Sequence, residues 1–143
     1  MKTYVRAIAL VMALVPCMAM TFADVGDVKA VNDAALQWLA LVDAGKYGES
    51  WDQASGFFKE KVTKEQWQEA ISGVRVPLGK VESRQFKLVE FKSELPQAPK
   101  GTYAVTQYRT KFANSAPMIE TITPMLEKDG TWKVSGYYIK PEE

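Results

Sequence analysis

Residues 118–139 read MIETITPMLEKDGTWKVSGYYI, and this stretch decides the fold. Asp129-Gly130 is the strongest short signal for a tight β-hairpin, because glycine readily adopts the positive φ that such turns require. The segments 118–128 and 131–139 on either side are together rich in Ile, Thr, Val and aromatic residues, as strands are. Pro124 predicts an edge position or a β-bulge, since proline has no N–H to give to a ladder. Counting back from the turn predicts that Thr121 lies opposite Tyr138, Met125 opposite Val134, and Glu127 opposite Trp132.

Two further strands are predicted before this hairpin. Residues 102–112, TYAVTQYRTKF, have the Thr, Tyr and Val content of a strand. In residues 81–92, VESRQFKLVEFK, apolar and polar residues alternate only loosely, and the apolar residues switch from one side of the strand to the other midway. We therefore expect this strand to be bent or bulged. Residues 95–101 form a loop between them, and Asn114-Ser115 turns the chain. Four such strands in succession predict an antiparallel meander.

Helical periodicity occupies the chain before the strands. Apolar residues at three- and four-residue steps predict a first helix over residues 28–42, which Asp24 or Asp27 can cap and Gly45 can end. The pattern predicts a second, shorter helix over residues 49–60.

The third helix has the clearest signals. Thr63 and Gln66 have the spacing of a capping box, and the apolar positions from Trp67 to Val74 then follow a helical period. Pro77 is expected to end this helix, because the residue before a proline is disfavoured in the helical conformation. The sequence therefore predicts an α+β fold in which three helices pack on a curved four-stranded antiparallel sheet.

The first 23 residues have the order of a secretory signal peptide. Lys2 and Arg6 precede an apolar run at 7–15 that is too short to span a bilayer. Thr21 and Ala23 then place small residues at the two ends of a cleavage tripeptide, which predicts a cut near Ala23. We therefore expect an exported, periplasmic protein whose single domain covers residues 24–143. Cys17 follows a proline rather than the small residue that a lipoprotein signal needs, so a lipid anchor there is not expected.

Composition excludes several classes of function. The chain has no histidine and its one cysteine lies in the predicted signal, so triad catalysis and zinc sites lack their usual residues. We expect no metal and no cofactor. Cleavage would remove two of 18 basic residues and none of 17 acidic ones, which leaves a net charge of −1. That balance argues against nucleic acid as a partner, because binding phosphates needs concentrated positive charge.

Four stretches together resemble a known family. They are 38–51 (WLALVDAGKYGESW), 75–79 (RVPLG), 120–124 (ETITP) and 132–138 (WKVSGYY). The chain resembles an exported bacterial family known as domain-of-unknown-function family 4019, and the resemblance covers nearly all of the mature chain. It implies a cone-shaped fold like that of nuclear transport factor two, also described as cystatin-like. It implies no established activity and no catalytic residues.

Asp43 and Tyr47 are the first candidates for a ligand site. Together with Ser50 and Trp51 they would place an acid and a phenol at the mouth of a cavity, where burial can tune an acid for proton transfer. The structural interpretation fits the spacing better, because a glycine at position 45 suits the corner between two helices. In that interpretation Trp51 belongs to the core.

Arg75 and Arg84 are the second candidates, on either side of residues 77–79. Two guanidinium groups near one turn can clamp a carboxylate or a phosphate through their planar forks. The structural alternative, which we favour, pairs them with Glu82, Glu90 or an acid of a helix, and so joins the third helix to the sheet.

The third candidates, Tyr108 and Tyr138, lie on predicted strands. Thr106, Tyr108 and Thr110 alternate and so point the same way, and with Tyr138 they would line a semi-polar pocket if that face meets the helices. Parity alone does not decide which face is inside, because both faces carry aromatic residues.

Three functional hypotheses follow. The first is a non-enzymatic module that binds a small ligand or a protein, favoured by plentiful aromatic residues and the lack of catalytic motifs. The second is an acid–base enzyme of the isomerase or hydrolase type, with Asp43 or Glu120 beside a tyrosine. The third is a homodimer assembled through the sheet face.

Overall fold

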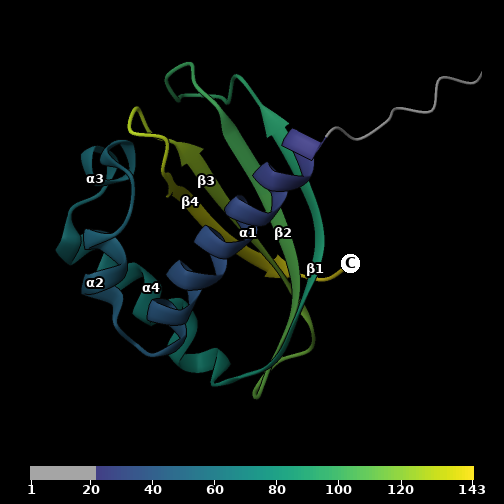
Figure 1. The fold of residues 1–143 in the computed structure, drawn as a ribbon. Coiled ribbons are helices and arrows are strands. Elements are labelled where there is room, and N and C mark those ends of the chain that lie inside the picture. Colours follow the sequence, from purple (N-terminus) through teal and green to yellow (C-terminus); the bar gives the residue numbers. More distant parts are fainter. Residues whose placement is uncertain (1–21) are drawn as a thin grey trace, which may run out of the picture.

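The structure is a computed structural model that describes residues 22–143. Within this range four helices precede four strands (Figure 1). The helices are α1 (Phe22–Asp43), α2 (Tyr47–Asp52), α3 (Gly56–Lys61) and α4 (Lys64–Leu78), and the strands are β1 (Val81–Lys92), β2 (Tyr103–Phe112), β3 (Met118–Leu126) and β4 (Trp132–Pro141). The α+β order is as predicted. The predicted signal peptide, including Cys17, lies outside the described residues except for positions 22 and 23, which begin α1.

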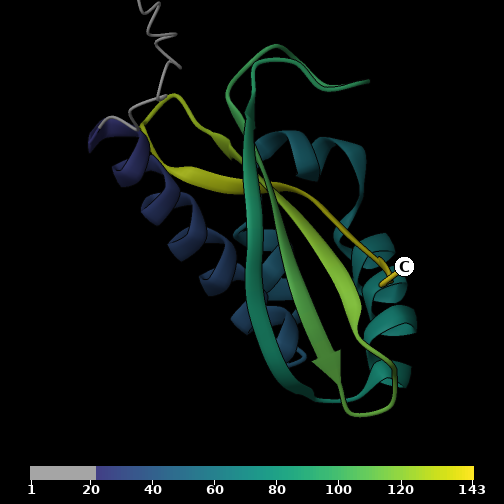
Figure 2. The ribbon, with the colours of Figure 1, turned by 90° about the vertical axis from the view of Figure 1, so that its right-hand side faces the viewer.

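The strands form one antiparallel sheet in the order β1-β2-β3-β4, which confirms the predicted meander. The helices lie together on one side of it, behind the sheet in Figure 2. The face of the sheet that meets the helices carries the buried side chains of Thr106, Tyr108 and Thr110. The alternation in the sequence did not show which face lies inside, and the structure does. None of the described helices combines the length and apolarity that a membrane span requires.

The register of the β3–β4 hairpin is only partly as predicted. Thr121 lies opposite Tyr138, but Met125 pairs with Lys133 rather than Val134, and Trp132 pairs with Leu126 rather than Glu127. The cause is the turn, in which the Glu127 N–H bonds the Thr131 carbonyl across a three-residue loop that ends in Gly130 at φ +85°. A three-residue loop shifts the count by one relative to a two-residue loop.

A β-bulge then restores the predicted pairing between β3 and β4. The register shifts between Ile122 and Pro124, where β4 contributes one residue more than β3, so the two errors cancel by Thr121. Pro124 therefore marks a bulge in an interior strand, one of its two predicted settings. The expected irregularity of β1 is also present, as register shifts near Glu82 and Lys87.

Within residues 22–143 there are four helices before the sheet rather than the predicted three. The segment 49–60 breaks after Asp52, and Ser55 starts α3 by accepting a hydrogen bond from the Phe58 N–H. The Ser55 N–H donates to the carbonyl of Val134 on β4. A continuous helix would use that N–H internally, so the contact with the sheet requires the break. At the other end of the helical region, α1 begins at Phe22, and Asp24 and Asp27 therefore lie within it rather than capping it.

The end of α4 also differs from the prediction. The helix continues through Pro77 to Leu78 instead of ending before the proline. Proline at this place removes only the bond to the carbonyl of Gly73, in the last turn, where the cost is small. Gly79, at φ +76°, then closes the helix with its N–H toward the carbonyls of Arg75 and Val76. The capping box of Thr63 and Gln66 at the start of α4 is confirmed.

An aromatic cluster fills the space between the helices and the sheet. Trp67 of α4 lies 5.7 Å from Trp38 of α1 and 5.0 Å from Phe58 of α3, measured between ring centroids. Tyr137 of β4 lies 5.5 Å from Trp38. The buried Ser50 connects them, because its carbonyl accepts from the Trp38 indole N–H at 2.8 Å and its hydroxyl oxygen from that of Trp67 at 2.9 Å.

Ser50→Ala is expected to lower the free energy of unfolding by about 1–3 kcal/mol, because it leaves the buried Trp67 indole N–H without an acceptor. Chemical denaturation followed by tryptophan fluorescence measures the change. Ser93→Ala, in an exposed loop, is the matched control and should shift stability by no more than about 0.5 kcal/mol. Equal effects of the two variants would contradict the role given to Ser50.

Candidate functional site

Asp43 is the last residue of α1, and the chain reverses directly after it. Gly45 adopts φ +73°, the Gly45 N–H donates to the carbonyl of Val42, and the Lys46 N–H donates to that of Leu41. These two bonds form a Schellman motif, for which glycine is the usual residue. The geometry agrees with the interpretation of Gly45 as a helix end. It places the Asp43 carboxylate at the C-terminal end of α1, within reach of α4.

Two arginines hold this carboxylate. Arg75 of α4 donates from Nη2 to Asp43 Oδ1 at 2.6 Å. Arg84 of β1 donates from Nη1 to Oδ2 at 2.7 Å and from Nη2 to Oδ1 at 3.0 Å. The second contact is a two-point fork, the geometry in which a guanidinium binds a carboxylate best. Of the partners predicted from the sequence, the helix acid is the one found, whereas Glu82 and Glu90 pair with lysines.

Glu120 of β3 completes the arrangement from the sheet side. Arg84 Nε donates to Glu120 Oε1 at 2.8 Å, and the Thr110 hydroxyl donates to the same oxygen. The Tyr137 hydroxyl donates to Oε2 at 2.6 Å. We call Asp43, Arg75, Arg84 and Glu120 the ion cluster. It has two positive and two negative charges and joins α1, α4, β1 and β3.

The ion cluster becomes more buried toward the sheet. The exposed fraction of the side chain is 27 % for Asp43, 12 % for Arg84, 4 % for Arg75 and zero for Glu120. The Arg75 guanidinium also stacks on the ring of Phe112, at 4.9 Å from its centroid. Its Nε and Nη1 have no hydrogen-bond partner within the described part of the chain, and Nη1 lies 3.9 Å from Glu120 Oε2.

This packing shifts the pKa values of Asp43 and Tyr137 in opposite directions. Burial alone would raise the pKa of Asp43, but the hydrogen bonds and charges of Arg84 and Arg75 outweigh it and hold that pKa below its ordinary value. Burial, together with the Glu120 charge, raises the pKa of the Tyr137 phenol. The Asp43 carboxyl group is therefore kept ionised, and the Tyr137 phenol keeps its proton.

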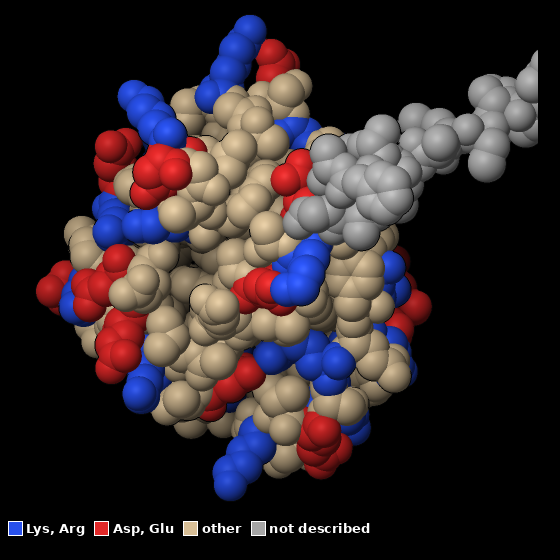
Figure 3. Space-filling view, in the orientation of Figure 1, with Lys and Arg blue, Asp and Glu red and all other residues tan. Residues whose placement is uncertain are grey.

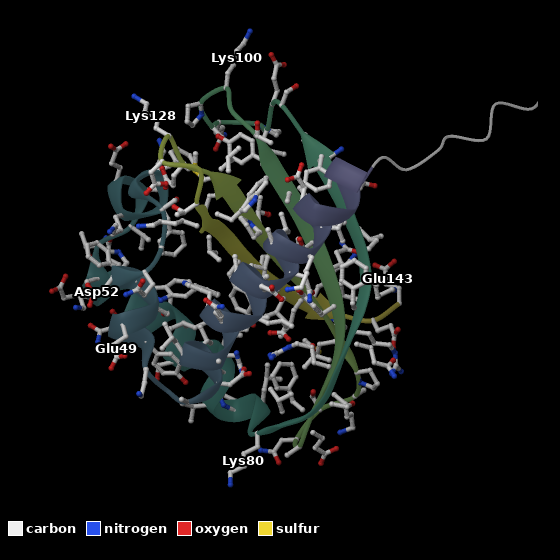
Figure 4. The ribbon with its side chains drawn as sticks, viewed as in Figure 1. Glu49, Asp52, Lys80, Lys100, Lys128 and Glu143 are labelled. Atoms are coloured by element: carbon white, nitrogen blue, oxygen red, sulfur yellow. The ribbon has the colours of Figure 1, made fainter. Side chains whose placement is uncertain are left out.

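The remaining candidates make no hydrogen bond to the ion cluster among the described residues. Tyr47 borders a depression of about 320 Å³ that Asp43, Arg75 and Lys80 also line; Lys80 is labelled below α4 in Figure 4. Tyr108 is buried, donates to Asn32 Oδ1 at 2.6 Å, and has its pKa raised to about 12, chiefly by burial. Tyr138 lies on the outer side of β4 and is 55 % exposed, so it does not share a pocket with Tyr108.

A second hollow opens between α1, α2 and the start of β4. It has a volume of about 360 Å³, and its walls include the rings of Trp38 and Trp132 and the side chains of Leu41 and Val134. The surface in Figure 3 is hollowed between the long helix α1 and the shorter helices to its left. We call this hollow the α1–α2–β4 cleft.

Polar side chains surround the same cleft. Gln37 projects from α1, Glu49 and Gln53 from the α2 side, and Lys133 from β4; Figure 4 labels Glu49 on α2. None of these four side chains takes part in a hydrogen bond or ion pair with another described residue. Sequence reasoning missed this set. Its only local signal was the spacing of Ala34, Gln37 and Leu41, which places them on one side of a helix.

The comparisons with known proteins place the chain in a family. The model of the family described as "Protein of unknown function (DUF4019)" matches residues 34–137. The chain belongs to this family. The resemblance seen in the sequence is therefore confirmed, and the family's description assigns no activity.

One solved structure shows the same kind of fold. It is a structure from Catenulispora acidiphila that has 10 % sequence identity, covers 84 % of this chain and 94 % of its own, and superposes with a TM-score of 0.57. At that identity the likeness concerns the fold alone. No curated protein matches the sequence.

Glu120→Gln is expected to lower the free energy of unfolding by about 3–5 kcal/mol, because it removes one partner of a buried ion pair and leaves guanidinium charge uncompensated. Equilibrium denaturation measures this loss. Glu82→Gln is the matched control, since the exposed Glu82–Lys111 pair should contribute at most about 1 kcal/mol. A small, equal loss in both variants would mean that the buried pair is not a structural requirement.

The lowered pKa of Asp43 predicts a dependence of stability on pH. A depressed folded-state pKa gives stability that is present above the unfolded value of 3.8 and lost as the pH falls through the folded value. Asp43→Asn should therefore be less stable than the wild type at pH 6, and the gap should narrow below pH 4. Urea titrations at several pH values test this, with Asp33→Asn, from an exposed pair with Lys29, as the control. A gap that stays constant down to pH 2.5 would contradict the assignment.

Proposed function

We propose that this protein is a non-enzymatic binding module that holds a small, partly apolar ligand in the α1–α2–β4 cleft. The observation that carries the proposal is the meeting of two indole rings with four unbonded polar side chains around one hollow of about 360 Å³. Small-molecule sites combine apolar walls with polar groups that fix orientation, and this cleft has both, with a large share of polar groups. The volume also lies in the range of about 300–1,000 Å³ that such sites occupy.

The cleft would select its ligand by shape and by charge. Trp38 is 4 % exposed and donates its indole N–H to the Ser50 carbonyl, so little of its ring reaches the hollow. The partly exposed Trp132 offers a ligand more apolar surface. Glu49 lines the hollow from α2 and Lys133 lines it from β4. A ligand with a flat apolar body and a polar or zwitterionic end fits this arrangement.

An acid–base enzyme is the second candidate, because Glu120 is buried and has the Tyr137 hydroxyl 2.6 Å away. The pair has the residue types that proton transfer needs. Both Glu120 oxygens already accept hydrogen bonds, and none of the hollows described above is lined by Glu120. Asp43 is held ionised by two arginines, which makes it a weak base at neutral pH. We therefore rank catalysis second.

The ligand-binding roles predicted for Asp43, Tyr47, Arg75, Arg84, Tyr108 and Tyr138 stay predictions. The ion cluster has zero net charge, so it offers less attraction to an anion than two free arginines would. The depression beside it is the place where Asp43, Tyr47 and Arg75 would meet a ligand.

We also propose that the protein is exported to the periplasm and that its fold is a cone of the nuclear-transport-factor-two type. The sequence of residues 1–23 supports export. Curvature of the sheet supports the cone, because Phe91 and Trp132 come from the two opposite edge strands and yet their ring centroids lie 6.2 Å apart.

Ala34→Trp should abolish ligand binding by filling the cleft. The assay is a screen of small aromatic amides and amino acids by backbone amide chemical shifts, with native mass spectrometry of the purified protein to detect any co-purified molecule. We expect shifts at Gln37, Gln53 and Lys133 in the wild type and none in the variant.

Ala40→Trp is the matched control, because Ala40 is an exposed alanine of α1 that does not line the cleft. It should bind as the wild type does. Shifts centred on the depression near Tyr47, or ligands that bind equally well to Ala34→Trp, would overturn the proposal.

A further inference from the structure

The two edges of the sheet differ in how they are protected. β1 carries five charged residues along its length and two register shifts, and both features discourage the addition of another strand. β4 carries no charged residue from Val134 to Ile139. An uncharged edge is a ready template for strand pairing.

The β4 edge is covered at one point and open beyond it. The carbonyl of Val134 accepts from the Ser55 N–H, so α3 covers the edge there. From Gly136 to Lys140 the backbone has no hydrogen bond to any described element other than β3. In this stretch the backbone groups of alternate residues point away from β3, and these are free to pair with another strand.

An apolar groove runs beside this open stretch. It has a volume of about 280 Å³ and lies between α4 and β4, with Ala70 and Val74 on the helix and Tyr138 and Ile139 on the strand. Val74 is 41 % exposed and Tyr138 is 55 % exposed, so the groove presents apolar side chains to solvent. The groove has the form of sites in which a helix and an edge strand receive an added strand.

We propose that a second copy of this chain fills the groove, with the two β4 strands paired antiparallel about a two-fold axis at Tyr138. A strand suited to the groove is uncharged and has apolar side chains at alternate positions on the inner face. The segment from Gly136 to Ile139 has these properties itself, with Tyr137 and Ile139 on the face that meets the helices.

The charges of β4 agree with this register. Tyr137 lies opposite Ile139 of the second copy, and Lys140 lies opposite its Gly136, so no like charges face each other. The outer sheet face is a poorer interface, because Gln107, Arg109 and Lys111 make it polar. The α1–α2–β4 cleft lies at the other end of β4, near Trp132, so assembly leaves it accessible. The dimer and the proposed ligand site are therefore separate claims.

Sedimentation velocity of the full chain, over a range of concentrations, tests the assembly. We expect a reversible dimer, and we expect Tyr138→Lys to raise its dissociation constant about tenfold, because two lysines then face each other at the axis. Leu88→Lys makes the same change on the outer side of β1 and should leave the dimer intact. A wild-type protein that is monomeric up to millimolar concentration would overturn the proposal and leave the groove to a strand of another protein.

A cysteine at the axis tests the register itself. In a Cys17→Ser background, Tyr138→Cys should form a disulfide-linked dimer on mild oxidation, because directly opposed residues of antiparallel strands have Cα atoms about 4.5–5.5 Å apart, within the range that a disulfide spans. Leu88→Cys is the control and should stay monomeric on denaturing gels. A wild-type dimer whose Tyr138→Cys variant does not cross-link would show that another surface is used, and would equally overturn the proposal.

Discussion

Glu120 is completely buried on the inner face of β3, and the arrangement of the helices depends on how its charge is compensated. An unpaired carboxylate in such a place would be very costly, so the chain has to bring cations to it. Arg84 arrives from the neighbouring part of the sheet, and Arg75 from α4. Both arginines also bind Asp43, which fixes the end of α1 against them. One buried charge thus determines where α1 and α4 lie relative to the sheet.

The same constraint shapes the two hollows on which our proposals rest. Because α1 is fixed at its C-terminal end by the ion cluster, its middle crosses the sheet beside the start of β4, and the cleft opens there (Figure 1). Because α4 is attached through Arg75 and the aromatic cluster, it stands beside the β4 edge and leaves the apolar groove. The ion cluster has no net charge and little exposure. Its role is to position the elements around the hollows, and the unbonded polar groups of the cleft are the ones available to a ligand.

Local signals in the sequence predicted the elements well where local chemistry decides them. The hairpin at Asp129-Gly130, the capping box at Thr63 and the end of α1 at Gly45 all depend on residues a few positions apart. Failures occurred where a distant contact overrides the local pattern. The break at Ser55 provides a hydrogen bond to Val134, 79 positions further on, and the predicted continuous helix passed over the local signal of a Ser55-Gly56 cap. The hairpin register was wrong near the turn and right beyond the bulge, because two one-residue shifts cancel.

The site was harder to predict than the fold for the same reason. Arg75, Arg84 and Asp43 stood out as residues of interest, and one predicted alternative paired the arginines with an acid of a helix, which the structure shows. Glu120 was not expected as their common partner, because strand parity leaves open which face of β3 meets the helices. The cleft was missed altogether, since its walls come from α1, α2 and β4, and no sequence spacing brings these together.

The most direct test of this account is a double-mutant cycle between Arg84 and Glu120, using Arg84→Gln, Glu120→Gln and the double variant, with unfolding free energies from chemical denaturation. If the buried charge controls the packing, the double variant will be more stable than the sum of the single losses predicts, with a coupling energy of about 1–3 kcal/mol. Losses that add within about 0.5 kcal/mol would show that the two side chains do not depend on each other, and would contradict the central claim.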